Sequence, residues 1–276
     1  MKRLLVPVDF SVQSEYAAKV AASIAKKTNA KIYLLHMLEL PSGVIDPSNF
    51  GATSNGPTAL LFMQRTRERF DEFKRLPFFE GIEMEDNVQF EKAFEGIISE
   101  SKKNNIDLIV MGSRGSSGLD EILVGSNTEK VVRNSEIPVL VIKEDTDNFK
   151  IENIVFASNF KSENKKSFQN ILDFTAKFNA KLHLLKINTI HNFETTKDSS
   201  DAIRNYINNY DLKDYTLNIY NDITVEMGVL NFSKLIEADI IILNTHGRRG
   251  LAHLFVGSIG EDLANHAKMP VVTFKL

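Results

Sequence analysis

The 276-residue sequence contains two copies of one pattern, and this internal repeat constrains the fold more than any other feature. Residues 2–37 match residues 152–187 at a constant offset of 150, and a later block matches at a constant offset of 132. Because both ends of a domain-sized unit keep their register, we expect two similar domains in tandem, at 1–145 and 150–276. The aligned pairs include Phe10 with Phe160, Asn29 with Asn179, Gly115 with Gly247, and Gly125 with Gly257.

The two offsets differ by 18 residues, so the first copy is longer in its middle. The extra residues fall within 41–57, a segment rich in Gly, Pro, Ser and Asn that we expect to be a long loop. Whether this loop closes over a ligand is left open. Residues 143–150 are mostly charged or polar and lack periodicity, so they are expected to link the two copies.

Short apolar runs alternate with amphipathic segments in each copy. This alternation predicts an α/β fold in which a parallel sheet is covered by helices on both faces. In the first copy we expect strands at 4–8, 31–37, 87–90, 106–111 and 138–142, and helices at 11–27, 59–75, 94–104 and 126–134.

Composition excludes several function classes. The sequence has no cysteine, which rules out disulfides, thiolate metal sites and cysteine nucleophiles. Its formal net charge of -3 gives no electrostatic attraction toward nucleic acid or an anionic membrane. No segment approaches the ~20 apolar residues that cross a bilayer. We therefore expect a soluble, cytoplasmic protein without nucleic-acid or membrane partners.

Some charged and histidine side chains have simple structural interpretations. The charges of residues 65–75 alternate at helical spacing, which predicts a solvated helix face. His36 and His183 lie in or beside apolar runs and lack a spaced partner, so they are interpreted as core or edge residues. No metal site is predicted.

A glycine-rich segment follows the apolar run 106–111 and has the chemistry of an anion site. Glycines let the backbone approach a phosphate closely, and the N–H groups at the next helix start favour an anion. Ser126 and Thr128 carry hydroxyls that can donate to phosphate oxygens, and Arg114 adds positive charge. Asp9 ends the first strand, where ligands of open α/β sheets are bound. A nucleotide site is therefore predicted.

The spacing of Gly112, Gly115 and the pair Gly125-Ser126 resembles the ATP-binding signature of the universal stress protein (UspA-like) family. The opening residues 6–11 and the closing run 138–142 resemble the same family. The resemblance implies two tandem five-stranded parallel sheets, each with strand order 3-2-1-4-5. It also implies a role in stress-response regulation rather than a defined catalytic reaction.

The resemblance further implies an ATP site in the first copy. Pro7, Val8 and Asp9 would line the adenosine end, while Met37 would contact adenine and Met111 would flank the base or ribose. Asn127 departs from the family pattern, because a small apolar residue is usual there. The residues expected around the phosphates are Gly112, Ser113, Arg114, Gly115, Gly125, Ser126, Asn127 and Thr128.

The second copy carries a degenerate version of this site. Asn159 replaces Asp9 and loses the charge-assisted acceptor that suits a ribose hydroxyl. Asn244 replaces the first glycine, and its side chain is expected to occupy the approach to the phosphate. We therefore expect this site to be weaker. Its residues are Asn159, Ile187, Asn244, His246, Gly247, Gly257 and Ser258.

These features favour a regulatory protein that binds ATP through its first domain, with any Mg²⁺ arriving on the nucleotide. No nucleophile–base pair is evident, so we expect no enzyme activity beyond slow ATP hydrolysis. One alternative is a ligand-free interaction scaffold whose loops are only structural. Another is an ATP pyrophosphatase or adenylating enzyme, although the glycine loop of that group is absent after the first strand.

Assembly follows from the last strand of each copy. An open last-strand edge exposes backbone groups, and pairing 138–142 with 270–274 inside one chain would cover both edges. We therefore expect an intramolecular pseudo-dimer of the two domains. A further homodimer of the whole chain is left open.

Overall fold

The computed structural model describes residues 1–38, 56–113, 125–146, 149–161, 165–245, 267 and 269–275. Strands and helices alternate along the chain, as the hydrophobic pattern predicts. The strands are β1 Arg3–Pro7, β2 Lys31–Met37, β3 Met84–Gln89, β4 Leu108–Gly112, β5 Val139–Ile142, β6 Asn153–Ala157, β7 Lys181–Asn188, β8 Tyr215–Asn221, β9 Ile240–Thr245 and β10 Val271–Lys275. The helices are α1 Val12–Thr28, α2 Gly56–Lys74, the 3-10 turn η1 Pro77–Phe79, α3 Ala93–Lys103, α4 Ser126–Asn134, α5 Lys165–Phe178, α6 Thr196–Ile207 and α7 Val225–Leu235.

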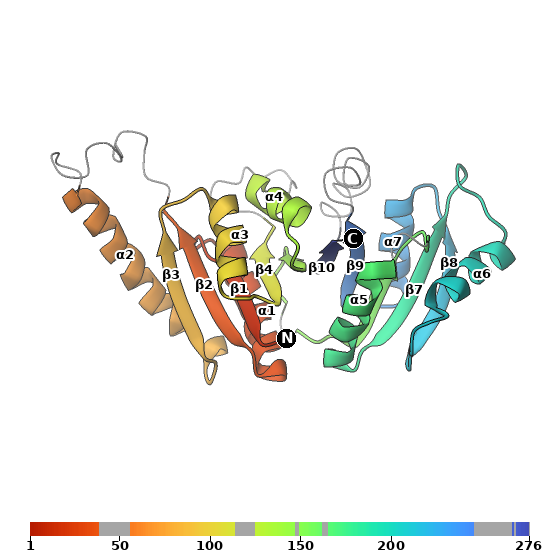
Figure 1. The fold of residues 1–276 in the computed structure, drawn as a ribbon, viewed down its shortest axis with the longest axis horizontal. Coiled ribbons are helices and arrows are strands. Elements are labelled where there is room, and N and C mark those ends of the chain that lie inside the picture. The colour runs from red at the N-terminus through yellow and green to blue at the C-terminus, as the bar shows by residue number, and fades with distance from the viewer. Residues whose placement is uncertain are drawn as a thin grey trace.

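All ten strands form one sheet, in the order β3-β2-β1-β4-β5-β10-β9-β6-β7-β8 (Figure 1). Within β1–β5 every pairing is parallel, which confirms the α/β class and the predicted order 3-2-1-4-5. The strands β6–β10 repeat this order and are also parallel to one another. We call β1–β5 with their helices the first half and β6–β10 with theirs the second half.

The two halves meet at the only antiparallel pairing between described strands, that of β5 with β10. Val141 lies opposite Val271, Leu140 opposite Val272, and Val139 opposite Thr273. The two last-strand edges therefore cover each other inside one chain. In the described sheet, β3 and β8 are left as the outer edges.

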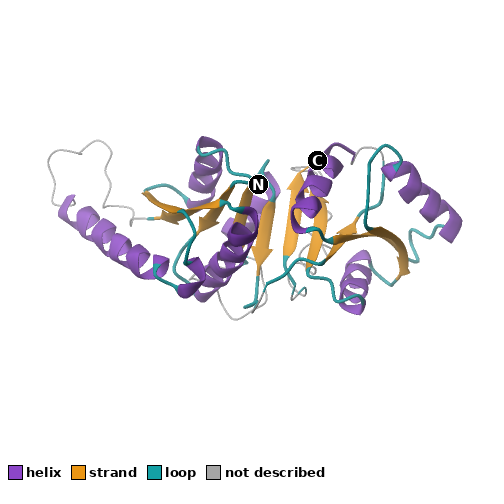
Figure 2. Ribbon diagram, turned by 90° about the horizontal axis from the view of Figure 1, so that it is seen from below, coloured by secondary structure: helices purple, strands orange, loops and turns teal. Residues whose placement is uncertain are grey.

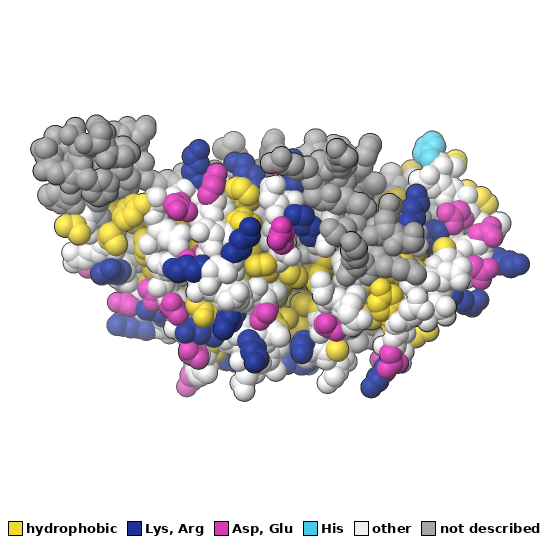
Figure 3. Space-filling model, viewed as in Figure 1, with side chains coloured by type: hydrophobic (Ala, Val, Ile, Leu, Met, Phe, Trp, Pro, Cys, Tyr) yellow, Lys and Arg dark blue, Asp and Glu magenta, His cyan; other side chains and the backbone are white. Residues whose placement is uncertain are grey.

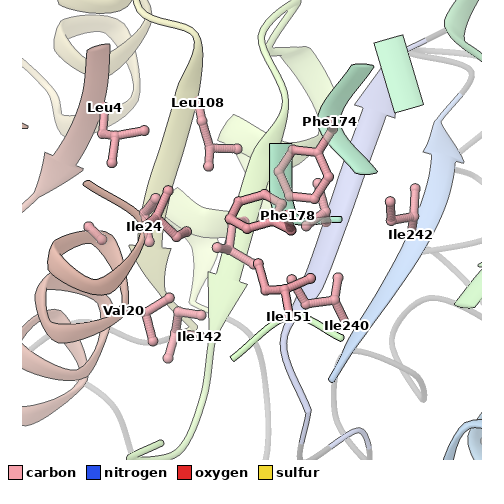
Figure 4. Close-up of a cluster of buried hydrophobic side chains, with 14 of the residues drawn as sticks. Leu4, Val20, Ile24, Leu108, Ile142, Ile151, Phe174, Phe178, Ile240 and Ile242 are labelled. Carbon is pink, nitrogen blue, oxygen red and sulfur yellow. The ribbon is translucent and has the colours of Figure 1, made fainter. Parts of the chain in front are cut away.

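Helices lie on both faces of the sheet, and the hydrophobic core is divided accordingly (Figure 2). On the face covered by α1 and α5, one continuous cluster runs from the first half into the second (Figure 4). On the face of α3 and α7, two separate clusters lie, one in each half. The shared cluster joins the halves by apolar burial as well as by strand pairing. Its members include Leu4, Ile24, Leu108, Ile142, Ile151, Phe174, Phe178 and Ile240.

Residues with a positive φ angle occur in pairs that are separated by the two sequence offsets, 150 and 132. Phe10 has φ 61° and Phe160 has φ 56°, at the turn that follows the first strand of each half. A bulky residue rarely adopts this conformation, so the turn is strained and must be held by its surroundings. The other pairs are Asn29 (φ 54°) with Asn179 (φ 53°), and Asn105 (φ 48°) with Glu237 (φ 52°).

Two elements begin three residues earlier than the sequence predicts, while the other expected boundaries in the first copy agree to within two residues. Helix α2 begins at Gly56 rather than at residue 59, because Pro57 is tolerated in the first turn of a helix, where an N–H has no partner. Strand β3 begins at Met84 rather than at residue 87. An edge strand tolerates polar residues, so its first residues carry no hydrophobic pattern that would predict a strand. Within the described residues, no helix is both long and apolar enough to span a bilayer.

Candidate functional site

A cavity of about 520 Å³ lies at the carboxyl ends of β1, β2 and β4, between the helices of the two faces. This is the position at which open parallel sheets bind ligands, and the volume suits a nucleotide-sized molecule. The lining residues are Pro7, Val8, Asp9, Ser14, Leu35, His36, Met37, Arg69, Ala93, Ile97, Met111, Gly112, Gly125, Ser126, Asn127 and Thr128.

The structure brings together most of the residues predicted to bind ATP. Every one of them that the structure describes lines this cavity, except Ser113. Ser113 is buried, and its backbone N–H donates to Ile142 (2.8 Å) while its carbonyl accepts from Gly125 (2.7 Å). Arg114 and Gly115 lie outside the described residues. The cavity gathers these side chains, and their role in binding remains a prediction.

Asp9 lies at the strained turn between β1 and α1. Its Oδ1 accepts from the backbone N–H of Ser11 (3.0 Å) and from the Ser11 hydroxyl (2.6 Å). The Ser11 Oγ in turn accepts from the N–H of Ser14 (3.2 Å) and caps α1. Asp9 therefore shapes the turn and also lines the cavity.

An aromatic cluster packs against the same turn. Phe10 packs 4.9 Å from the His36 ring and 5.2 Å from the fully buried Phe70 of α2. The guanidinium of Arg69 lies 4.2 Å from the Phe10 ring centroid and borders the cavity. Arg69 is exposed, as expected for a solvated helix face, and in addition it contacts Phe10 and borders the cavity. Its signal was its place beside an apolar helix stripe that includes Phe70 and Phe73.

His36 lies at the cavity wall. Its Nδ1 bonds the carbonyl of Val8 (2.6 Å). Burial lowers the pKa of His36, and the nearby Arg69 lowers it further, while the Val8 carbonyl and Asp9 act in the opposite direction. The pKa of His183 in the second half is also lowered, mainly by burial.

These lowered pKa values predict a loss of stability in mild acid. The unfolded chain takes up protons near the ordinary histidine pKa of 6.5, while the folded chain resists them, so stability falls as the pH drops below 6.5. The melting temperature should decrease between about pH 7.5 and about pH 5.5, before most carboxylates titrate. His36→Gln should flatten that decrease. His191→Gln, at an exposed position, should leave it unchanged, and equal slopes in both variants would contradict this assignment.

The phosphate end of the cavity is built by β4 and α4. Gly125 is the N-cap of α4 and makes no side-chain capping bond, so the first N–H groups of this helix face the cavity without an intrahelical partner. Ser126 and Asn127 are exposed beside them. Thr128 is buried and its hydroxyl donates to the Gly112 carbonyl (2.9 Å), so the expected donation of this hydroxyl to phosphate is not what the structure shows.

Gly112 is required by helix packing. A Cβ at this position would lie 2.9 Å from the backbone carbon and oxygen of Gln13, in the first turn of α1. On the opposite face, a Cβ at Gly96 would lie 2.1 Å from the Met37 Cε, which is the end of a flexible side chain and constrains the packing less. Gly112 therefore lets α1 approach the end of β4 closely, which limits the width of the cavity on that side.

The second half arranges the corresponding residues differently. Asn244 is buried, and its Oδ1 accepts from the Ser167 hydroxyl of α5 (3.0 Å). The expectation that its side chain occupies the phosphate approach is therefore wrong. The Asn244 side chain points toward α5, the first helix of its half, just as a Cβ at Gly112 would point toward α1. Asn159 keeps the turn, since its Oδ1 accepts from the Lys161 N–H (3.1 Å). His246, Gly247, Gly257 and Ser258 lie outside the described residues.

Lys186 stands where the first half has His36, and it is tied down by an ion pair. The ammonium of this buried residue bonds Glu194 in the β7–α6 loop. Asn188 donates to the Glu194 carbonyl (3.0 Å), and the buried Ser199 lies within reach of both residues (3.4 Å). This network fastens the short loop to the end of β7 and has no counterpart in the described part of the first half.

The sequence profile of the universal stress protein family matches residues 1–143 and 223–275. The chain belongs to the universal stress protein family. Universal stress protein MJ0531 of Methanocaldococcus jannaschii is 33% identical over 147 residues, covering 52% of this chain and 82% of that protein. MJ0577 of the same organism is 27% identical over 153 residues, covering 51% and 94%. Residues 144–222 lie outside the profile match, although their strands complete the second half.

Solved structures support the fold of the whole chain. A universal stress protein from Archaeoglobus fulgidus superposes with a TM-score of 0.74 and 23% identity, covering 99% of this chain and 96% of that one. A functionally unknown protein, PA1789 from Pseudomonas aeruginosa, superposes with a TM-score of 0.65 and 17% identity. At these identities the likeness concerns the fold alone.

Proposed function

We propose that this universal stress protein is a cytoplasmic stress-response regulator that binds ATP in the cavity of its first half. The observation that carries the proposal is the convergence of three features on one cavity. Asp9 offers an acceptor for a ribose hydroxyl, Met37 and Ile97 offer an apolar surface for a base, and the start of α4 offers N–H groups for phosphates. Mg²⁺ would arrive on the nucleotide.

The proposed role is binding rather than catalysis. Two lining hydroxyls donate their protons to backbone carbonyls, Ser14 to Ser11 (2.9 Å) and Thr128 to Gly112 (2.9 Å). His36 Nδ1 is occupied by the Val8 carbonyl. None of these described groups is arranged as a nucleophile beside its base, so hydrolysis of bound ATP is expected to be slow.

Addition of ATP to the intact protein tests the proposal. A ligand that binds only the folded state increases the free energy of unfolding, by about 2.7 kcal/mol at a ligand concentration of 100 times its Kd. The melting temperature rises as a result. We expect a rise that saturates with ATP and is absent with inorganic phosphate at the same concentration. No rise at millimolar ATP would contradict binding.

Arg69 should contribute to ATP affinity. Among the described lining residues it carries the positive charge and Asp9 the negative charge, so its removal leaves a carboxylate facing an anionic ligand. We expect Arg69→Gln to raise the Kd for ATP by about five- to tenfold in low salt. Arg67→Gln, two residues earlier on α2 and outside the lining, is the matched control and should leave the Kd unchanged. Equal effects in a calorimetric titration would contradict a specific role.

A ligand-free scaffold is the second candidate, and one observation favours it. Gly112 and Thr128 both have structural roles that need no ligand, in helix packing and in the hydrogen bond that joins α4 to β4. The scaffold predicts no co-purifying nucleotide, which the ultraviolet spectrum of acid-quenched protein would reveal.

Acidic and basic side chains are interspersed on the face shown in Figure 3, so that face offers no extended patch of one sign.

We further propose that the two halves act as an internal pseudo-dimer. The antiparallel pairing of β5 with β10 and the hydrophobic cluster shared between the halves support this assembly.

A further inference from the structure

The two outer edges of the sheet, β3 and β8, differ in their chemistry. An edge strand presents unpaired N–H and C=O groups to solvent, and proteins usually protect such edges with charge, proline or bulges. Strand β3 contains Glu85 and Asp86. Strand β8 reads Tyr-Thr-Leu-Asn-Ile-Tyr-Asn over seven residues, with no charge and no proline, and each residue is at least partly exposed.

The register shows which backbone groups of β8 are open. Leu182 of β7 donates to the Asp214 carbonyl (3.0 Å), and Asp222 donates to the Asn188 carbonyl (3.0 Å). Since the direction of these groups alternates along a strand, the even-numbered residues of β8 face β7. Among the described strands, β7 is the only one that pairs with β8. The backbone groups that point outward are those of Tyr215, Leu217, Ile219 and Asn221.

The same reasoning shows that β3 is protected against pairing with itself. Ile32 donates to the Glu83 carbonyl (3.0 Å), so Met84, Asp86 and Val88 point their backbone groups outward. Two copies of β3 that paired along these groups would place Asp86 directly opposite Asp86 of the second copy. Like charges directly opposite each other destabilise an antiparallel pair.

The geometry points to β8 as an interface that joins two copies of this chain. The strands pair antiparallel about a two-fold axis at Asn218, which lies opposite Asn218 of the second copy. Leu217 then forms a hydrogen-bonded pair with Ile219 of the second copy, and Tyr215 forms one with Asn221 of the second copy. The two-fold axis repeats each of these pairs on its other side. Antiparallel pairing of a strand with itself is the closed, isologous arrangement of a dimer.

The side chains of β8 suit this pairing. Leu217 and Ile219 already pack against the core shared by both halves, and the pairing continues that apolar row into the second copy. Asn218 donates to the Thr216 Oγ1 (2.8 Å) and carries no charge to the axis. Just beyond the strand, this register places Asp222 opposite the exposed Asp214 of the second copy. The Asp222 carboxylate is turned back from that pair, because it accepts from Ile223 (2.7 Å) and Asn231 (2.8 Å). The chain already uses antiparallel pairing at the β5–β10 junction.

Single cysteines test the two-fold axis, because the chain has no cysteine of its own. Residues opposite each other in a non-hydrogen-bonded antiparallel pair have Cα atoms about 4.5 Å apart, within the range of a disulfide. Under mild oxidation, intact Asn218→Cys should form a covalent dimer of about twice the 31.1 kDa chain mass. Asn221→Cys, the matched control opposite a tyrosine, should cross-link at least about tenfold more slowly.

Sedimentation equilibrium of the unmodified chain gives an independent measurement. We expect a concentration-dependent dimer, and Ile219→Pro should weaken it at least about tenfold, because proline removes an outward N–H that β7 does not use. A monomer at all concentrations would overturn the proposal. So would equal cross-linking of Asn218→Cys and Asn221→Cys, or a dimer indifferent to Ile219→Pro, since each places the contact elsewhere. ATP is absent from these experiments, so their outcome is independent of nucleotide binding.

Discussion

Replacement of Gly125 by aspartate is expected to abolish ATP binding while leaving the protein folded. Gly125 is the N-cap of α4, with φ -62° and ψ 145°, a conformation open to any L-residue. Aspartate is among the best N-cap residues, so Gly125→Asp should raise stability by about a few tenths of a kcal/mol. The same carboxylate would accept hydrogen bonds from the N–H groups that the phosphates need, and its negative charge would repel the phosphates. We expect the Kd for ATP to rise at least about a hundredfold.

Gly125→Asn separates the two effects of this substitution. Asparagine caps the helix as well as aspartate does but adds no charge. We expect it to weaken ATP binding much less than Gly125→Asp, with both variants melting at or above the temperature of the unmodified protein. Tight ATP binding by Gly125→Asp would mean that the phosphates do not lie at the start of α4.

Truncation of Phe70 should cause the largest loss of stability among the predictions. Phe70 is fully buried in α2 and packs edge-on against Phe10, the strained residue of the β1–α1 turn. Phe70→Ala removes this packing and leaves a cavity, at an expected cost of about 3–5 kcal/mol. Thermal unfolding should show a melting temperature lower by about 10 °C.

Phe62 supplies the control on the same helix. Its side chain is 40% exposed, so Phe62→Ala should change stability by no more than about 0.5 kcal/mol. If both truncations lowered the melting temperature equally, α2 would owe its position to general apolar burial. The link between α2 and the left-handed turn at Phe10 would then be refuted.

The fold could be predicted from the sequence because its signals are long and repeated. The constant offsets preserved Phe10 and Phe160, and these residues share a left-handed backbone in the structure. The apolar runs that became β1 and β4 could only be buried strands. The largest displacements, of three residues, are at the starts of β3, an edge strand with a polar sequence, and of α2, because neither carries an apolar period at that point.

The site could be predicted less completely, because its details depend on side-chain direction. Spacing placed Asp9, Gly112 and Gly125 at one cavity, since parallel strands end at the same sheet edge. It could not show that the Asn244 side chain turns toward Ser167, nor that the Thr128 hydroxyl is used by the Gly112 carbonyl. Arg69 was missed because a charge on an amphipathic helix gives no sign of which neighbour it reaches.

ATP is expected to bind more tightly in the first half than at the degenerate site of the second half. Calorimetric titration of the intact chain with ATP and Mg²⁺ tests it most directly. We expect about one equivalent of tightly bound ATP per chain, loss of that tight binding in Gly125→Asp, and unchanged binding by Gly257→Asp, the corresponding position of the repeat. Two equivalents of equal affinity per chain, or a loss of binding in Gly257→Asp with retention in Gly125→Asp, would contradict this expectation.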